Sequence, residues 1–175
     1  MNRLILGGAK SGKSLFAETL ALRSQKELVY IATAQAHDDE MKQRIKTHQQ
    51  RRLNQHLKWI NREEPIALSS VIQQESSNNR LILIDCLTLW LSNLLSGLSE
   101  KQRQAEIDDL FECIVNCSSD LIFVSNETGL GIVPMNQLSR QFIDLSGSLH
   151  QRMAQVSDCV IMTIAGLPLV LKGRI

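Results

Sequence analysis

Residues 3–14 read RLILGGAKSGKS, and this stretch decides the fold of the chain. Residues 3–6 form a short apolar run typical of a buried strand, and the residues after 13 have the pattern of an amphipathic helix. Residues 7–14 lie between them and match the full G-x-x-x-x-G-K-[ST] spacing of a phosphate-binding loop. An ordinary glycine-rich turn is the alternative, but spacing, Lys, Ser and context together favour nucleotide binding.

Each position of this loop has a chemical reason. Glycines let backbone N–H groups converge on phosphate oxygens, and the helix that follows directs its positive end at the same point. Lys13 can reach the outer phosphates, and the Ser14 hydroxyl is a ligand that suits Mg²⁺. We expect the nucleotide to contact the whole loop: Gly7, Gly8, Ala9, Lys10, Ser11, Gly12, Lys13 and Ser14.

Short apolar runs alternate with longer helical patterns along the rest of the chain. Strands are predicted at 3–6, 28–33, 81–85, 121–125 and 160–164, and helices near 13–24, 38–52, 64–76, 87–96, 100–116 and 136–155. This alternation predicts an α/β fold with a mainly parallel sheet and helices on both faces. Such sheets bind ligands at the carboxyl ends of their strands.

Composition narrows the function classes. The 175 residues suit one domain, spanning 1–175, and 43% hydrophobic with 21% charged residues is typical of a globular protein. The net charge of +1 offers no broad surface for nucleic acid. We expect no signal peptide, because the N-terminus leads straight into a strand and a glycine-rich loop, and no membrane span, because polar residues interrupt the most apolar stretch, 81–98. The four cysteines form no CxxC pair, which favours reduced thiols in the cytoplasm over a metal site.

Asp85 ends the apolar run 81–85, where a phosphate-binding fold needs an acidic residue near its metal ion. The alternative is an Asp that caps the helix beginning near Leu87, and the two roles are compatible. We therefore predict that Asp85 and Ser14 serve the metal.

His48 lies within a predicted helix that begins with acidic residues and ends with basic ones. Arg44, Arg51 and Arg52 would lie one turn away and could hold a phosphate group against the imidazole. Nearby cations disfavour imidazolium and leave a nitrogen that can act as nucleophile. From the residues alone, however, a solvated basic helix face is the simpler interpretation.

Four blocks together resemble a known family, the bifunctional adenosylcobinamide kinase/adenosylcobinamide-phosphate guanylyltransferases of cobalamin biosynthesis. The first block is the loop at 7–14, and the second is Tyr30 to Gln35 with Asp38 to Met41, Arg44, Ile45 and His48. The third is 85–95, DCLTLWLSNLL, and the fourth is 125–134, SNETGLGIVP, with Leu138, Arg140, Phe142, Asp144 and Gly147. The likeness covers almost the whole chain, and its second and fourth blocks are the specific ones.

The resemblance implies two reactions and a RecA-like P-loop fold. A nucleoside triphosphate, ATP or GTP, phosphorylates the hydroxyl of adenosylcobinamide; GMP from GTP is then joined to that phosphate, with release of pyrophosphate. Family members carry the GMP on a histidine, and His48 stands at the matching position, which overturns the simpler interpretation. The resemblance also implies a homotrimer, and guanine-nucleotide contacts at the loop, Thr33, Ala34, Gln35, Arg51, Arg52, Glu63 and Asp85.

Two positions depart from the family pattern. Lys10 stands where Arg is expected, which keeps the charge but loses a bidentate grip. His150 stands where Asn is usual, and we assign it no role. Glu127, at a strand end before two glycines, is open between a ligand contact and a structural loop residue.

Two rival functions remain open on the sequence. One is a P-loop kinase of another small molecule with a single activity, which leaves the His48 helix without a role. The other is a nucleotide-binding switch or assembly module without catalysis, which would bind nucleotide without consuming it.

Overall fold

A computed structural model describes residues 1–35, 39, 42, 43, 46, 50 and 59–175 of the chain. Its strands are β1 (Asn2–Gly7), β2 (Glu27–Ala32), β3 (Trp59–Glu63), β4 (Arg80–Asp85), β5 (Asp120–Asn126), β6 (Cys159–Ile164) and β7 (Leu167–Lys172). Its helices are α1 (Lys13–Leu22), α3 (Leu68–Glu75), α4 (Leu87–Gly97), α5 (Glu100–Asn116) and α6 (Gln137–Val156). The helix predicted over 38–52 falls mostly outside the described residues and stays a prediction.

The strands form one sheet in the order β3-β2-β4-β5-β1-β6-β7. Every pairing is parallel except that of β6 with β7. Parallel strands need crossover connections, and helices supply most of those described here. The predicted α/β sheet is therefore confirmed.

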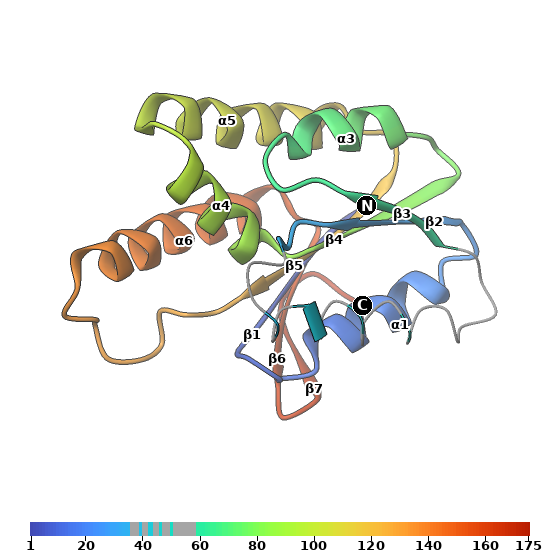
Figure 1. Cartoon of the computed structure of the whole chain (residues 1–175). Helices are drawn as coiled ribbons and strands as arrows, with labels where there is room; N and C mark the ends of the chain where they lie inside the picture. The colour runs from blue at the N-terminus through green and yellow to red at the C-terminus, as the bar shows by residue number, and fades with distance from the viewer. Residues whose placement is uncertain (36–38, 40–41, 44–45, 47–49, 51–58) are drawn as a thin grey trace.

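Helices cover both faces of this sheet (Figure 1). The apolar strand residues of one face pack with α3, α4, α5 and α6, and those of the other face pack with α1. Alternate residues of one strand divide between the two clusters, as Leu4 and Ile5 do. Burial on both faces explains why the central strands are continuous apolar runs rather than alternating ones.

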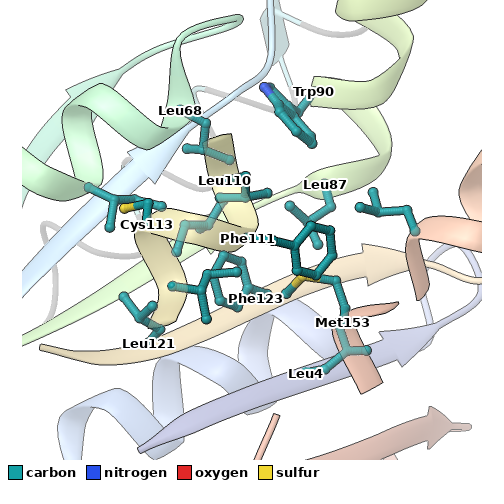
Figure 2. Packing of buried hydrophobic residues seen from close by; sticks show 14 of the residues in the cluster. Leu4, Leu68, Leu87, Trp90, Leu110, Phe111, Cys113, Leu121, Phe123 and Met153 are labelled. Atoms are coloured by element: carbon teal, nitrogen blue, oxygen red, sulfur yellow. The ribbon is translucent and has the colours of Figure 1, made fainter. Parts of the chain in front are cut away.

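The larger cluster lies under the four helices of one face (Figure 2). Leu4, Leu121 and Phe123 of the strands belong to one cluster with Leu110 of α5 and Trp90 of α4. Trp90 is fully buried, and its indole N–H donates to the Ile66 carbonyl at 2.7 Å. That bond ties α4 to the loop that leads into α3.

Two strands were missed from the sequence, and the start of one predicted helix needs correction. β3 and β7 are both edge strands: β3 is mostly polar, and Pro168 interrupts the short apolar run of β7. The helix predicted from 64 begins instead at Leu68. Pro65 disfavours helical geometry at Glu64, whose carboxylate accepts from the N–H groups of Ile66 and Ala67, both at 2.8 Å.

The apolar stretch at 81–98 is a strand and a helix, β4 and α4, as predicted. Of the helices that the structure describes, none has the length and hydropathy that a bilayer crossing requires.

Candidate active site

The candidate site lies at the carboxyl ends of β1, β5 and β6. Gly7, the last residue of β1, is in register with Asn126 of β5 and Thr163 of β6. The glycine-rich loop begins at this row and leads into α1. Open parallel sheets bind ligands at the carboxyl ends of their strands, and the loop lies at those ends, so this is where phosphate should bind.

The loop folds back on itself before α1 begins. Lys10 and Gly12 have positive φ angles of 57° and 94°, and the Ser11 N–H donates to the Gly8 carbonyl at 3.2 Å. A Cβ at Gly7 would meet Ser11 Oγ and would lie 2.7 Å from the backbone carbonyl oxygen of Thr163, so only glycine fits there. No described side chain caps the N-terminus of α1, and its first turn holds no acidic residue. Its free N–H groups can therefore bind an anion.

The turn between β6 and β7 packs against the phosphate loop. Ala165 and Gly166 both have positive φ angles, 51° and 80°, as a two-residue hairpin turn demands. The Gly166 N–H donates to the Ser11 carbonyl at 3.0 Å, and a Cβ on Gly12 would lie 3.2 Å from the Gly166 Cα. Sequence reasoning missed this support, although the Ala-Gly pair before an apolar run is a signal for it.

Lys13 is the charged group at the centre of the loop. Its side chain is buried, and Nζ donates to the Gly8 carbonyl at 3.0 Å. Burial lowers the pKa of Lys13, while the neighbouring Cys86 and the Asp85 carboxylate raise it. The ammonium group thus sits in a poorly solvated position, where an arriving phosphate would gain a strong electrostatic partner.

Asp85 ends β4, as predicted, but β5 lies between β4 and the strand of the loop. Its Oδ2 accepts a hydrogen bond from the Tyr30 hydroxyl at 3.0 Å. Its negative charge is one of the groups that raise the pKa of Lys13 against the effect of burial. Burial and the Asp85 charge raise the pKa of Cys86 to about 11, so the adjacent thiol stays neutral.

Thr33 ties the end of β2 to the end of β4. Its hydroxyl donates to the Cys86 carbonyl at 2.7 Å and accepts from the Cys86 N–H at 2.9 Å. Its own N–H donates to the Asp85 carbonyl at 3.3 Å, and its carbonyl accepts from Asn93 at 2.8 Å. These hydrogen bonds hold the backbone of Thr33 in place, and Ala34 and Gln35 follow it directly in the chain.

Buried polar atoms without partners gather at this edge. In the part of the chain that is described, such side-chain atoms include Ser11 Oγ, Asn126 Oδ1 and Thr163 Oγ1. Asn126 and Thr163 are the two register partners of Gly7. Buried polar groups are normally hydrogen-bonded, so exceptions concentrated at one place indicate a site for a polar ligand.

The remaining predicted residues divide into two groups. Glu63 ends β3, the edge strand next to β2, and its register partner is Ala32. His48, Arg51 and Arg52 lie outside the described residues. The structure therefore brings the loop, Thr33 to Gln35 and Asp85 to one edge of the sheet, and the His48 prediction stands on the sequence alone.

Sheet order, loop and buried lysine define a P-loop nucleotide-binding protein of the α/β class. A solved ATPase of the type III secretion system of pathogenic bacteria shares this fold, with a TM-score of 0.57 and 13% identity. The match covers 97% of this chain and 56% of that one.

Sequence comparison narrows the class to one family. The model of the cobinamide kinase/cobinamide phosphate guanyltransferase family matches residues 3–171. The bifunctional adenosylcobalamin biosynthesis protein CobP of Pseudomonas aeruginosa is 48% identical, with 99% of each chain covered. The corresponding CobU protein of Escherichia coli K12 is 33% identical, covering 97% of this chain and 98% of the relative. The chain belongs to the cobinamide kinase/cobinamide phosphate guanyltransferase family.

Proposed function

We propose that residues 1–175 form one catalytic domain that carries out both reactions on adenosylcobinamide. In the first, its hydroxyl takes the γ-phosphoryl group of ATP or GTP. In the second, GMP from GTP is joined to the new phosphate through a GMP-His48 intermediate, and pyrophosphate leaves. The observation that carries this proposal is the complete phosphate loop with a buried Lys13, in a chain whose family performs cobinamide phosphorylation and guanylyl transfer.

The same nucleotide site would serve both steps. Gly7 to Ser14 would bind the phosphates, and Lys13 would stabilise charge on the transferring group. Thr33, Ala34 and Gln35 would border the nucleotide from the end of β2, with Glu63 beside them on β3. Arg51 and Arg52 would neutralise the α-phosphate while His48 attacks it.

Mg²⁺ fits the donors present. Ser14 and Asp85 offer a hydroxyl and a carboxylate, the hard oxygen ligands that Mg²⁺ prefers, and the Asp85 charge acts on Lys13 within the same site. Ser14 and Asp85 would hold the ion, which would neutralise charge on the phosphates. Mg²⁺ usually keeps several waters and binds substrate phosphates, so two protein ligands suffice.

Location and assembly belong to the same proposal. We place the enzyme in the cytoplasm, where its nucleotide substrates are found and where cysteines stay reduced. We also propose a homotrimer. It is supported by exposed apolar side chains on the edge strand β7, including Leu167, Leu169 and Leu171, since such surfaces mark interfaces.

Asp85→Asn should lower kinase activity about 10- to 100-fold at low Mg²⁺, and added Mg²⁺ should restore part of it. Asparagine keeps an oxygen for the Tyr30 hydroxyl but loses the charge that recruits the ion. Activity measured against Mg²⁺ concentration checks this. Tyr30→Phe is the matched control, since it removes that hydrogen bond and keeps the carboxylate. If Asp85→Asn changes thermal stability alone, Asp85 has only a structural role.

The test of the function itself is turnover by the unaltered protein. Incubation with adenosylcobinamide, ATP or GTP and Mg²⁺ should give the phosphorylated corrinoid, and GTP should then yield adenosylcobinamide-GDP and pyrophosphate. A single-activity kinase would stop at a phosphorylated product. A binding module would hold nucleotide without consuming it. Chromatography of the corrinoid products separates the three outcomes.

A further inference from the structure

A chain of buried polar groups lies behind the phosphate loop, on the side of α4 and α6. His150 of α6 places Nε2 2.7 Å from the Ser125 hydroxyl of β5, and Nδ1 3.6 Å from Glu127 Oε2. Ser125 Oγ lies 3.0 Å from the Thr88 hydroxyl, which accepts from the Asn126 N–H at 2.6 Å. His150, which has no role predicted from sequence, thus has two partners, Ser125 and Glu127, and Ser125 links it to Thr88.

The directions of these hydrogen bonds follow from their two ends. Nδ1 faces Glu127 Oε2 and a carboxylate can only accept, so the neutral tautomer that suits this pair carries its proton on Nδ1. In a neutral ring Nε2 then accepts, so the Ser125 hydroxyl donates to it. The backbone N–H of Asn126 can only donate, so the Thr88 oxygen accepts there and its own hydroxyl proton is free for Ser125. The directions derived from the Glu127 end and from the Asn126 end therefore agree: Thr88 donates to Ser125, and Ser125 donates to His150.

Burial favours this neutral ring. The His150 side chain is 8% exposed. Burial lowers its pKa, and the Glu127 carboxylate opposes that shift. A neutral imidazole with its Nδ1 proton aimed at Glu127 fixes the position of the carboxylate without cancelling its charge.

Glu127 stands next to the phosphate loop. It is the first residue after β5, and its N–H donates to the carbonyl of Gly7 at 3.0 Å. Its Oε1 accepts from the Gly129 N–H at 2.6 Å. Its side chain is 21% exposed, so the carboxylate is held in place and still reachable from the site.

We propose that Glu127 is the base of the kinase step and that His150 is the residue that positions it. This inference rests on the proposed function. The acceptor hydroxyl oxygen would form a bond to the γ-phosphorus as the bond from that phosphorus to the β-γ bridging oxygen breaks. The nucleoside diphosphate leaves with that electron pair, and the hydroxyl proton passes to a Glu127 carboxylate oxygen.

Two features of the site agree with this role. The 3.6 Å contact from Nδ1 to Oε2 is longer than a hydrogen bond, as catalytic contacts often are before substrate binds. The two reactions also differ in what they need. The kinase step must remove a hydroxyl proton, whereas the acceptor in guanylyl transfer is a phosphate that is already ionised. A base at Glu127 is therefore required for the first reaction only.

The experiment compares three variants in both half-reactions, assayed separately. Glu127→Gln should lower kcat of the kinase step about 10²-fold, as loss of a general base does. His150→Ala should lower it about 10-fold, with KM for the nucleotide unchanged. His150→Asn should recover part of that loss, because its amide can replace Nδ1 as a donor to Glu127, although it is too short to take the place of Nε2 at Ser125. Guanylyl transfer to supplied adenosylcobinamide phosphate should stay near the unaltered rate in all three.

Other results would overturn the proposal. If Glu127→Gln weakens both half-reactions equally, or raises KM for the nucleotide, Glu127 serves nucleotide binding instead. If His150→Ala and His150→Asn are equally slow while their thermal unfolding differs, His150 is only a packing residue. An unaltered protein without either activity would refute the proposed function itself, and that outcome is distinct from both.

Discussion

Lys13→Ala should lower kinase turnover by about 10²- to 10³-fold, the loss expected when one preorganised charge is removed from a transferring group. Lys13 is buried at the N-terminus of α1, and its ammonium lies at the Gly8 carbonyl. In that poorly solvated place its charge acts strongly on phosphate. The measurement is steady-state phosphorylation of adenosylcobinamide, with nucleotide binding measured separately.

The protein should fold as well without this lysine. Burial already lowers the pKa of Lys13, so the charged group has an unfavourable desolvation term in the free protein. Thermal unfolding of Lys13→Ala should therefore match or exceed that of the unaltered chain. Lys101→Ala is the control, since Lys101 is exposed on α5 and the substitution removes the same charge. Near-native turnover by Lys13→Ala would remove this residue from the mechanism.

The central sheet could be predicted because its strands are buried on both faces. A run such as 81–85 has almost no alternative to a parallel strand when it is bounded by polar residues and followed by a helix. Of the two edge strands, β3 carries no such signal, whereas β7 does contain a short apolar run that Pro168 interrupts. Trp59–Glu63 contains three polar or charged residues out of five, and only its pairing with β2 identifies it as a strand.

The same distinction holds for the site: features made by contiguous residues could be predicted, and contacts between distant residues could not. The phosphate loop is contiguous in sequence, so its spacing alone indicated its function. The support of the loop by Gly166 joins residues more than 150 positions apart; the Ala165-Gly166 pair indicates a turn, but no local pattern reports which segment that turn contacts. The same holds for His150, whose partners Ser125 and Glu127 come from another element. Glu127 was visible in sequence as a polar residue at a strand end, but its partner was not.

Asp85 shows a further limit. The sequence places it correctly at the end of a strand, but not the strand β5 between it and the loop. Strand order depends on the crossovers of the whole chain, whereas strand ends are local. Despite this separation, the Asp85 charge still contributes to raising the pKa of Lys13.

His48→Ala should abolish guanylyl transfer and leave kinase activity in large part. The expected reason is that His48 Nε2 or Nδ1 attacks the α-phosphorus of GTP, pyrophosphate leaves, and the GMP is then passed to the corrinoid phosphate. A covalent route divides one difficult transfer into two easier displacements. The kinase step needs the phosphate loop but no histidine nucleophile, so the two activities should separate in this variant.

The decisive measurement is incubation with GTP labelled at the α-phosphate, followed by mapping of the labelled residue. Label should enter from the α-phosphate and not from the γ-phosphate, and it should be lost in acid and stable in alkali, as a phosphoramidate is. His56→Ala is the matched control, since it removes another histidine from the same segment and should keep the label. A labelled His48→Ala protein, or label on a different one of the four histidines, would show that another residue carries the nucleotide even though the family is right.

Lys13→Ala should also reduce the label, because it weakens GTP binding. A higher GTP concentration distinguishes the two variants, since it should restore part of the labelling of Lys13→Ala and none of the labelling of His48→Ala.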